Sequence, residues 1–226
     1  MPKKIITYSI FLIIIPALII SGCIIFREKQ YAFITASVAI LACCAFFLSF
    51  EKNEHSVQTL TIIASLTAIS IISRIIFAPL QNFKPVTAII IIAAIYFGGE
   101  AGFMVGAMTA LISNFYFSQG PWTPFQMLAW GLIGFFAGIF SNTLKKNKAW
   151  LIIYGAFAGI LYSMLMDIYS VLWFDGGFNL SRYIVTAASS LRFTVIYAVS
   201  NIIFLFILAK PIGKKLGRIK NKYIGN

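Results

Sequence analysis

The chain has 226 residues, of which 60% are hydrophobic and only 11% are charged, whereas ordinary globular chains carry about 25% charged residues. So few charges cannot cover a water-soluble fold, but a bilayer accepts an apolar exterior with charges in the loops. The composition therefore predicts an all-α integral membrane protein. The net charge of +12 is interpreted as a signal of membrane topology, and no nucleic-acid partner is expected.

Eight apolar segments follow one another, and most are long enough to cross about 30 Å of hydrocarbon at about 1.5 Å per residue. They cover residues 5–26, 31–50, about 60–80, 85–97, 101–117, 124–140, 150–173 and about 183–208. The segment 85–97 is short and is predicted to cross the membrane only partly. No convincing internal repeat divides the chain, so an inverted-repeat transporter is not indicated.

The first two segments form a predicted unit of their own, residues 1–58, ahead of a six-helix domain over residues 59–226. Segment 5–26 has about 22 mostly apolar residues and no A-x-A site, which favours a retained span over a signal peptide. Ile20-Ser21-Gly22-Cys23 resembles the lipobox of bacterial lipoproteins. Processing at Cys23 is therefore an alternative, although such short strings arise easily in apolar helices.

Basic residues are distributed unevenly between the two sides of the predicted membrane. Twelve lie on the side of the N-terminus: Lys3, Lys4, Lys52, Lys145, Lys146, Lys148, Lys210, Lys214, Lys215, Arg218, Lys220 and Lys222. Only four lie on the other side: Arg27, Lys29, Lys84 and Arg182. This asymmetry predicts that both termini are cytoplasmic. The basic stretch 210–222 is also a candidate for binding anionic membrane lipid.

Residue patterns of the common catalytic and metal sites are missing. The chain has no GxxxxGK[ST] phosphate loop, no HExxH, no GxSxG and no pair of carboxylates within the predicted spans. Cys23, Cys43 and Cys44 lie in apolar runs and His55 in a polar connector, without the grouping that zinc requires. The sequence therefore predicts neither an enzyme nor a metal site.

Three ionisable residues lie inside predicted spans: Arg74, Asp167 and Arg192. Counted from the predicted outer end of each helix, all three lie roughly 9 to 14 Å below the outer surface. A charge at this depth is costly and usually finds a partner or lines a cavity. Two arrangements stay open: a buried bridge between Asp167 and one arginine, with the other reaching outward, or a cationic floor beneath an outward-facing cavity.

Three loops predicted on the outer side, 80–85, 118–124 and 173–179, combine aromatic rings, amides and rigid Pro or Gly turns. This mixture suits a large polar ligand, although an aromatic belt at the membrane interface would also place tryptophans here. The loops and the intramembrane charges give the predicted binding residues: Arg74, Asn82, Phe83, Lys84, Gln119, Trp122, Gln126, Trp130, Asp167, Phe178, Asn179 and Arg192.

Small residues recur at four-residue spacing, which lets helix backbones approach closely. The stripes are Gly98, Gly102, Gly106 and Ala110, then Gly134 and Gly138, then Gly155 and Gly159. Packing within the bundle is expected for all of them. Ala64 and Ala68 repeat the spacing in the helix predicted at 60–80, where the alternative is a surface that receives the helices of another protein.

The strings at residues 82–88, 97–103, 113–115 and 119–127, the last containing GPWTP, resemble the substrate-binding S component of an energy-coupling factor (ECF) vitamin transporter, most closely the cobalamin-specific kind. The resemblance covers about residues 60–210. It implies a six-helix bundle in the bacterial plasma membrane that binds a vitamin from outside beneath the three loops. It also implies that Ala64 and Ala68 dock on a scaffold subunit, and that two partner ATPases use the ATP.

The substrate that the resemblance implies is cobalamin, with no cofactor belonging to the chain itself. The phosphodiester of cobalamin would face Arg74 or Arg192, while Trp122, Phe83 and Phe178 would cover its rings. The alternatives are an S component for riboflavin or a queuosine precursor, a self-sufficient secondary transporter, and a membrane enzyme or assembly factor. The two helices before residue 60 are additional to the six-helix core.

Overall fold

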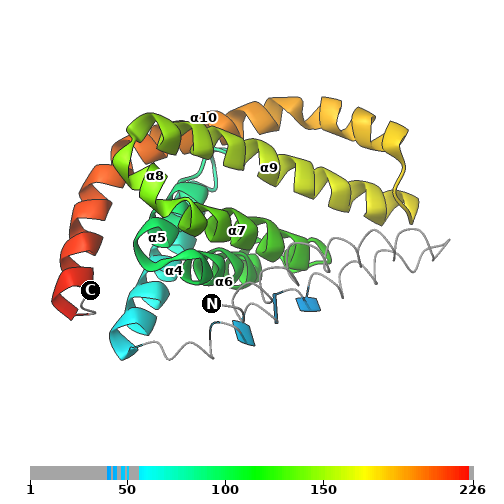
Figure 1. The fold of residues 1–226 in the computed structure, drawn as a ribbon. Coiled ribbons are helices and arrows are strands. Elements are labelled where there is room, and N and C mark those ends of the chain that lie inside the picture. The colour runs from blue at the N-terminus through cyan, green and yellow to red at the C-terminus, as the bar shows by residue number, and fades with distance from the viewer. Residues whose placement is uncertain (1–39, 42, 45–46, 49, 51–55, 224–226) are drawn as a thin grey trace, which may run out of the picture.

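The structure is a computed structural model that describes residues 40, 41, 43, 44, 47, 48, 50 and 56–223 (Figure 1). These residues form helices and no strands. Four described helices are long and apolar enough to cross a membrane: α4 (Val57–Ile76), α7 (Trp122–Ile139), α9 (Lys148–Asp175) and α10 (Leu180–Tyr223). The others are α5 (Val86–Phe97), α6 (Gly99–Phe117) and the short α8 (Ser141–Lys146). The predicted helical membrane bundle is confirmed.

Helix α5 lies at the centre of the bundle and packs against α4, α6, α7 and α10. It has 12 residues and ten of them are buried, as expected for a helix that is apolar on every side. At about 1.5 Å per residue its length is about 18 Å, so the prediction of a short helix is confirmed, while its partial crossing of the membrane stays a prediction. The short length leaves room at one end of the bundle for the loop between α4 and α5.

Helices α6 and α7 approach closely at glycines, as the small-residue pattern predicted. A Cβ atom added to Gly102 would lie 2.7 Å from the carbonyl oxygen of Gly134, and one added to Gly134 would lie 2.4 Å from that of Gly102. In the same way, a Cβ atom at Gly159 on α9 would lie 2.6 Å from the backbone nitrogen of Ala198 on α10. These glycines are therefore packing residues of the bundle.

Local side-chain chemistry explains where several helices begin and end. Ser56 caps α4 by accepting a hydrogen bond from the Thr59 N–H, and Asn147 caps α9 by accepting from the Ala149 N–H. Gly98 joins α5 to α6 with a φ of +94°, a conformation that favours glycine. The sharp junction lets α6 fold back directly along α5.

The last helix is longer than predicted. The sequence predicts an end near residue 208, where the apolar run stops, but α10 continues to Tyr223 with Pro211 inside it. Figure 1 shows that α10 bends toward its C-terminal end, as helices commonly do at proline. Beyond Pro211, Leu216 is buried and the Lys220 Nζ donates to the Tyr96 carbonyl oxygen at 3.0 Å. Hydropathy marked the apolar part of the helix, whereas packing against α5 extends it.

The N-terminal predictions fall largely outside the described residues. These include the span 5–26, the lipobox-like Cys23 and the connector residue His55. The described parts of the second predicted span are helical, and the Phe47 ring packs edge-on against Phe103 of α6 at 6.4 Å. The division at residue 58 stays a prediction.

Candidate functional site

A polar cavity of about 140 Å³ lies beside the loop that joins α4 to α5. Helices α4, α7, α9 and α10 each contribute at least one side chain, and α5 contributes its first turn. The lining residues are Arg74, Asn82, Lys84, Val86, Thr87, Gln126, Trp130, Tyr162 and Tyr197. Five of the twelve predicted binding residues are among them: Arg74, Asn82, Lys84, Gln126 and Trp130.

Arg74 is the most firmly held cation of this cavity, with only 8% of its surface exposed. Its Nη1 donates to the Ser113 hydroxyl and, at 2.8 Å, to the Asn114 Oδ1, both on α6. Its guanidinium also lies over the rings of Phe117, at 4.5 Å, and Trp130, at 5.1 Å. These contacts keep the charge buried without a carboxylate, at the cost of desolvation that hydrogen bonds and rings partly offset.

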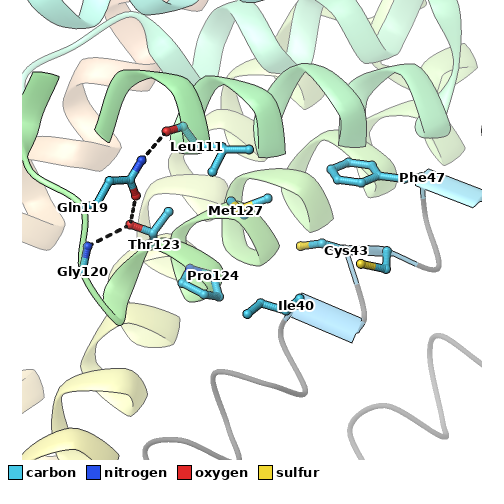
Figure 2. A pocket seen from close by; sticks show the side chains of 10 residues that line it. Ile40, Cys43, Phe47, Leu111, Gln119, Gly120, Thr123, Pro124 and Met127 are labelled. Carbon is cyan, nitrogen blue, oxygen red and sulfur yellow. Dashed lines mark hydrogen bonds between the residues drawn. The ribbon is translucent and has the colours of Figure 1, made fainter. Parts of the chain in front are cut away.

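The loop between α6 and α7 holds Arg74 in place through a chain of hydrogen bonds that begins at Asn114. The Asn114 amide that accepts from Arg74 also donates to the Thr123 hydroxyl at 2.9 Å, and Thr123 in turn donates to the Gln119 Oε1 at 2.9 Å. Figure 2 shows Gln119 turned back toward α6, where its Nε2 donates to the Leu111 carbonyl at 2.9 Å. The GPWTP segment therefore acts first as a clamp that fixes Asn114 and, through it, Arg74.

Aromatic rings form one wall of the cavity. Trp130 and Tyr162 stack with ring centroids 5.3 Å apart and 17° between their planes, and Tyr197 meets Tyr162 edge-on at 5.0 Å. The Gln126 Nε2 donates to the Tyr162 hydroxyl at 2.7 Å, and the Tyr197 hydroxyl donates to the Asn82 Oδ1 at 2.9 Å. This wall is flat and apolar on its face and polar at its edges, as suits a planar ligand with polar substituents.

Gln126 carries a polar atom that the protein leaves without a partner. The side chain is 6% exposed, and its Oε1 has no hydrogen-bond partner although it is buried. Buried side-chain polar atoms are almost always paired. A donor on a ligand in the cavity would satisfy this oxygen.

Lys84 adds a second positive charge. It lies in the α4–α5 loop, where its backbone N–H donates to the Ser200 hydroxyl at 2.9 Å and its Nζ lies 5.1 Å from the centre of the Phe117 ring. Burial, and to a smaller extent the neighbouring Arg74, lower the pKa of Lys84 below its ordinary value. No carboxylate lines the cavity among the described residues. The cavity is therefore cationic, and an anion bound here would favour the charged form of Lys84.

Seven predicted binding residues lie away from the lining, and five of them have structural roles in the loops. Phe83 packs against Phe204 at 5.1 Å, Gln119 belongs to the clamp, and the Trp122 ring lies against Gly120. Asn179 caps α10 by accepting from the Arg182 N–H, and Phe178 packs near Tyr183 at 5.8 Å. Contact of these residues with a ligand stays a prediction.

The buried bridge between Asp167 and an arginine is not formed, while the common depth of Arg74, Asp167 and Arg192 stays a prediction. Asp167 accepts from the Ser190 hydroxyl at 2.7 Å and forms an ion pair with neither Arg74 nor Arg192. Arg192 is exposed and lies over the ring of its neighbour Phe193 at 4.9 Å. On α10, Ser200 contacts the α4–α5 loop, whereas Ser190, which contacts Asp167, lies about 15 Å farther toward the start of the helix. The sequence estimate counted residues from the end of each helix separately. It therefore could not include the offset between the α9–α10 hairpin and the α4–α5 loop.

A comparison with protein families identifies the family of this chain. The model of the family described as "ECF-type riboflavin transporter, S component" matches residues 54–218, well over half of the chain. The chain belongs to this family. Searches of curated proteins and of solved structures gave no match. This ECF S component is thus the substrate-binding membrane subunit of an ECF transporter, a transport subunit rather than an enzyme.

The predicted docking residues of the S component lie on the surface of α4. Ala64 and Ala68 are exposed, next to exposed Ser65 and Ile69 on the same helix. The small side chains leave a shallow apolar strip along α4. Docking of a scaffold subunit on this strip stays a prediction.

Several site residues were missed from the sequence. Tyr162 and Tyr197 lie within long apolar segments, where a tyrosine is indistinguishable from an ordinary core residue. Ser113 and Asn114 stand out more, because two adjacent polar side chains inside an apolar span need buried partners. That signal, together with the lone Arg74 on another span, could have paired α4 with α6.

Proposed function

We propose that this S component captures cobalamin or a related corrinoid from outside the cell and delivers it inward. The observation that carries the proposal is the cationic cavity, in which Arg74 and Lys84 flank the Phe117 ring and no described carboxylate balances them. Cobalamin carries an anionic phosphodiester that suits two cations at one end of a cavity. The GPWTP resemblance to cobalamin-specific S components supports the same substrate.

The cavity of about 140 Å³ is far smaller than a whole corrinoid, so it would receive one end of the ligand. In this arrangement the phosphodiester lies toward Arg74 and Lys84, and a ligand amide donates to the Gln126 Oε1. The corrin ring would then extend toward the α9–α10 hairpin, where Phe178 and Asn179 lie. The carboxyl-free lining matters most, because a buried carboxylate would repel the phosphodiester.

Transport requires partners that this chain does not replace. We propose that a scaffold subunit docks on α4 and that two ATPase subunits supply the energy from ATP. In this assembly the basic end of the bundle, with Lys145–Lys148 and the end of α10, faces the cytoplasm of a bacterial cell, and both termini are cytoplasmic. The excess of lysine and arginine on that side supports this orientation.

Riboflavin is the second candidate substrate. The description of the matching family names it, and the stacked Trp130 and Tyr162 rings suit a flat isoalloxazine. Riboflavin carries no anionic group, so it leaves the two cations of the cavity without a matching charge. Its binding would therefore depend on the aromatic wall and on Gln126 rather than on Arg74.

Calorimetric titration separates these substrates. The whole chain, purified in detergent without partners, is titrated with cobalamin and with riboflavin. We expect one-to-one binding of cobalamin and much weaker binding of riboflavin. Tighter binding of riboflavin than of cobalamin would make riboflavin the substrate. If folded protein binds neither compound, both substrates are overturned while the family is unchanged.

The docking strip gives a separate prediction. Replacing Ala64 and Ala68 together with tryptophan adds two large rings to an exposed face, so we expect substrate affinity to change less than about twofold. ATP-driven uptake in vesicles with the scaffold and ATPases should fall at least about tenfold, because close helix packing requires small residues. The matched control places tryptophans at Val195 and Val199, which are exposed on α10 at the same four-residue spacing, and should leave uptake near normal. Full uptake by the tryptophan variant would contradict docking at this strip.

A further inference from the structure

A second cavity lies at the basic end of the bundle, far from the site described above in the sequence and in chemistry. Its volume is about 440 Å³, and five lysines stand around it: Lys145, Lys146, Lys148, Lys210 and Lys214. Its remaining wall is largely apolar and includes Ile92, Leu151 and Phe206. The cavity thus combines a cationic rim with an apolar floor.

The positive charge of this rim is not balanced within the described part of the chain. None of the five lysines forms an ion pair with a described carboxylate, and no described carboxylate lines the cavity. Instead, the Lys148 Nζ lies 3.4 Å from the centre of the Phe206 ring, and the Lys145 Nζ lies 4.9 Å from that of Tyr96. Burial, and then the charge of Lys220, lower the pKa of Lys145. An anion would relieve the repulsion among these groups.

The fold holds this rim together through the unexpected extension of α10. Leu216 is buried, the Lys220 Nζ donates to the Tyr96 carbonyl oxygen, and a Cβ atom at Gly213 would lie 2.4 Å from the Tyr96 hydroxyl oxygen. This contact of α10 with the end of α5 brings Lys210 and Lys214 opposite the lysines of α8 and α9. The cavity is therefore a product of tertiary packing rather than a run of charges on one flexible tail.

We propose that this cavity binds one anionic phospholipid, with the phosphate among the five lysines and the start of an acyl chain along Ile92, Leu151 and Phe206. Basic pockets between helices at the cytoplasmic interface suit such headgroups. The apolar floor favours a lipid over an acidic protein surface, because only an amphiphile matches both parts of the cavity. The proposal is independent of the vitamin that the other end of the bundle binds.

The test uses the full chain, purified in detergent and stripped of lipid, with binding measured by native mass spectrometry. We expect phosphatidylglycerol to bind as a single copy and phosphatidylcholine to bind far more weakly. Replacing Lys146, Lys148 and Lys210 with glutamine should weaken phosphatidylglycerol binding roughly 100-fold, since each lysine near a charged headgroup contributes a factor of about five. The single variant Lys146→Gln should weaken it about fivefold and serves if the triple variant does not fold.

The matched control replaces Lys215, Arg218 and Lys222, which lie outside the cavity lining, with glutamine and removes the same charge. It should change the affinity less than about twofold. Equal losses in both triple variants would overturn the proposal in favour of diffuse attraction by the basic tail. Equal binding of phosphatidylcholine would overturn the headgroup contact, and equally tight binding of inorganic phosphate would overturn the acyl contact. If the variant with glutamine at Lys146, Lys148 and Lys210 binds lipid normally but no longer assembles with the scaffold subunit, the cavity would be a contact site for a partner protein instead.

Discussion

Replacing Arg74 with glutamine should lower the affinity for cobalamin about 100-fold, measured by calorimetric titration of the purified chain. Truncating one partner of a buried, hydrogen-bonded charge pair commonly costs about 2 to 5 kcal/mol, and the proposed phosphodiester loses its best-fixed cation. Glutamine is uncharged and shorter than arginine, so the hydrogen bonds of Arg74 to Ser113 and Asn114 are weakened as well. Arg74→Lys should restore only part of the affinity, because an ammonium lacks the planar donors of a guanidinium.

Arg192→Gln is the matched control for this variant. Arg192 is exposed and lies outside the cavity lining, so its loss should change the affinity less than about twofold. Thermal unfolding of both variants separates loss of binding from loss of fold. If Arg74→Gln does not fold, Lys84→Gln tests the same charge from the loop and should weaken binding about tenfold. Unchanged affinity in folded Arg74→Gln and Lys84→Gln would rule out the cationic cavity as the anion site.

Replacing Gly134 with alanine should destabilise the bundle by about 3 kcal/mol, at the upper end of the usual cost of overpacking. The added Cβ atom would lie 2.4 Å from the Gly102 carbonyl oxygen and 2.5 Å from its carbon. Both are backbone atoms of α6, so no side chain can turn away to relieve the contact. The measurement is the thermal unfolding temperature in detergent, with monodispersity as the readout if the variant cannot be purified.

The same substitution at Gly177 is the control for Gly134→Ala. Nothing lies within 4 Å of a Cβ atom added there, and surface substitutions of this kind usually change stability by less than about 0.5 kcal/mol. Gly177→Ala should therefore unfold near the temperature of the unchanged protein. Similar unfolding temperatures for the two variants would show that α6 and α7 do not require the close approach at Gly134.

Most helices could be predicted from the sequence because a bilayer imposes a simple rule. A segment must be apolar over about 20 residues to cross hydrocarbon, and its glycines mark where helices pack. The starts and ends of α5, α6 and α7 accordingly agree with prediction to within about two residues. The rule says nothing about a polar segment, which is why α8 and the C-terminal part of α10 were missed.

The binding site was predicted in part. Arg74, Asn82, Lys84, Gln126 and Trp130 converge on one cavity, because a lone cation in a span and polar groups beside an outer loop need common partners. Arg192 was grouped with them by depth alone, and the structure instead leaves it exposed. Two arginines at the same estimated depth can face different directions, since hydropathy does not encode the rotation or the offset of a helix.

Apolar segments dominate the sequence and its basic residues gather toward one side, which is enough to identify a helical membrane bundle. Its motifs also carried the resemblance to ECF S components in general, which the family comparison supports. Three features depend on tertiary packing: which polar residues meet, the contact of the GPWTP segment with Asn114 behind Arg74, and the packing of α10 over the end of α5. The physical reason is that burial and composition act on each segment separately, whereas hydrogen-bond partners and cavities arise from the rotation, offset and close approach of segments distant in the chain.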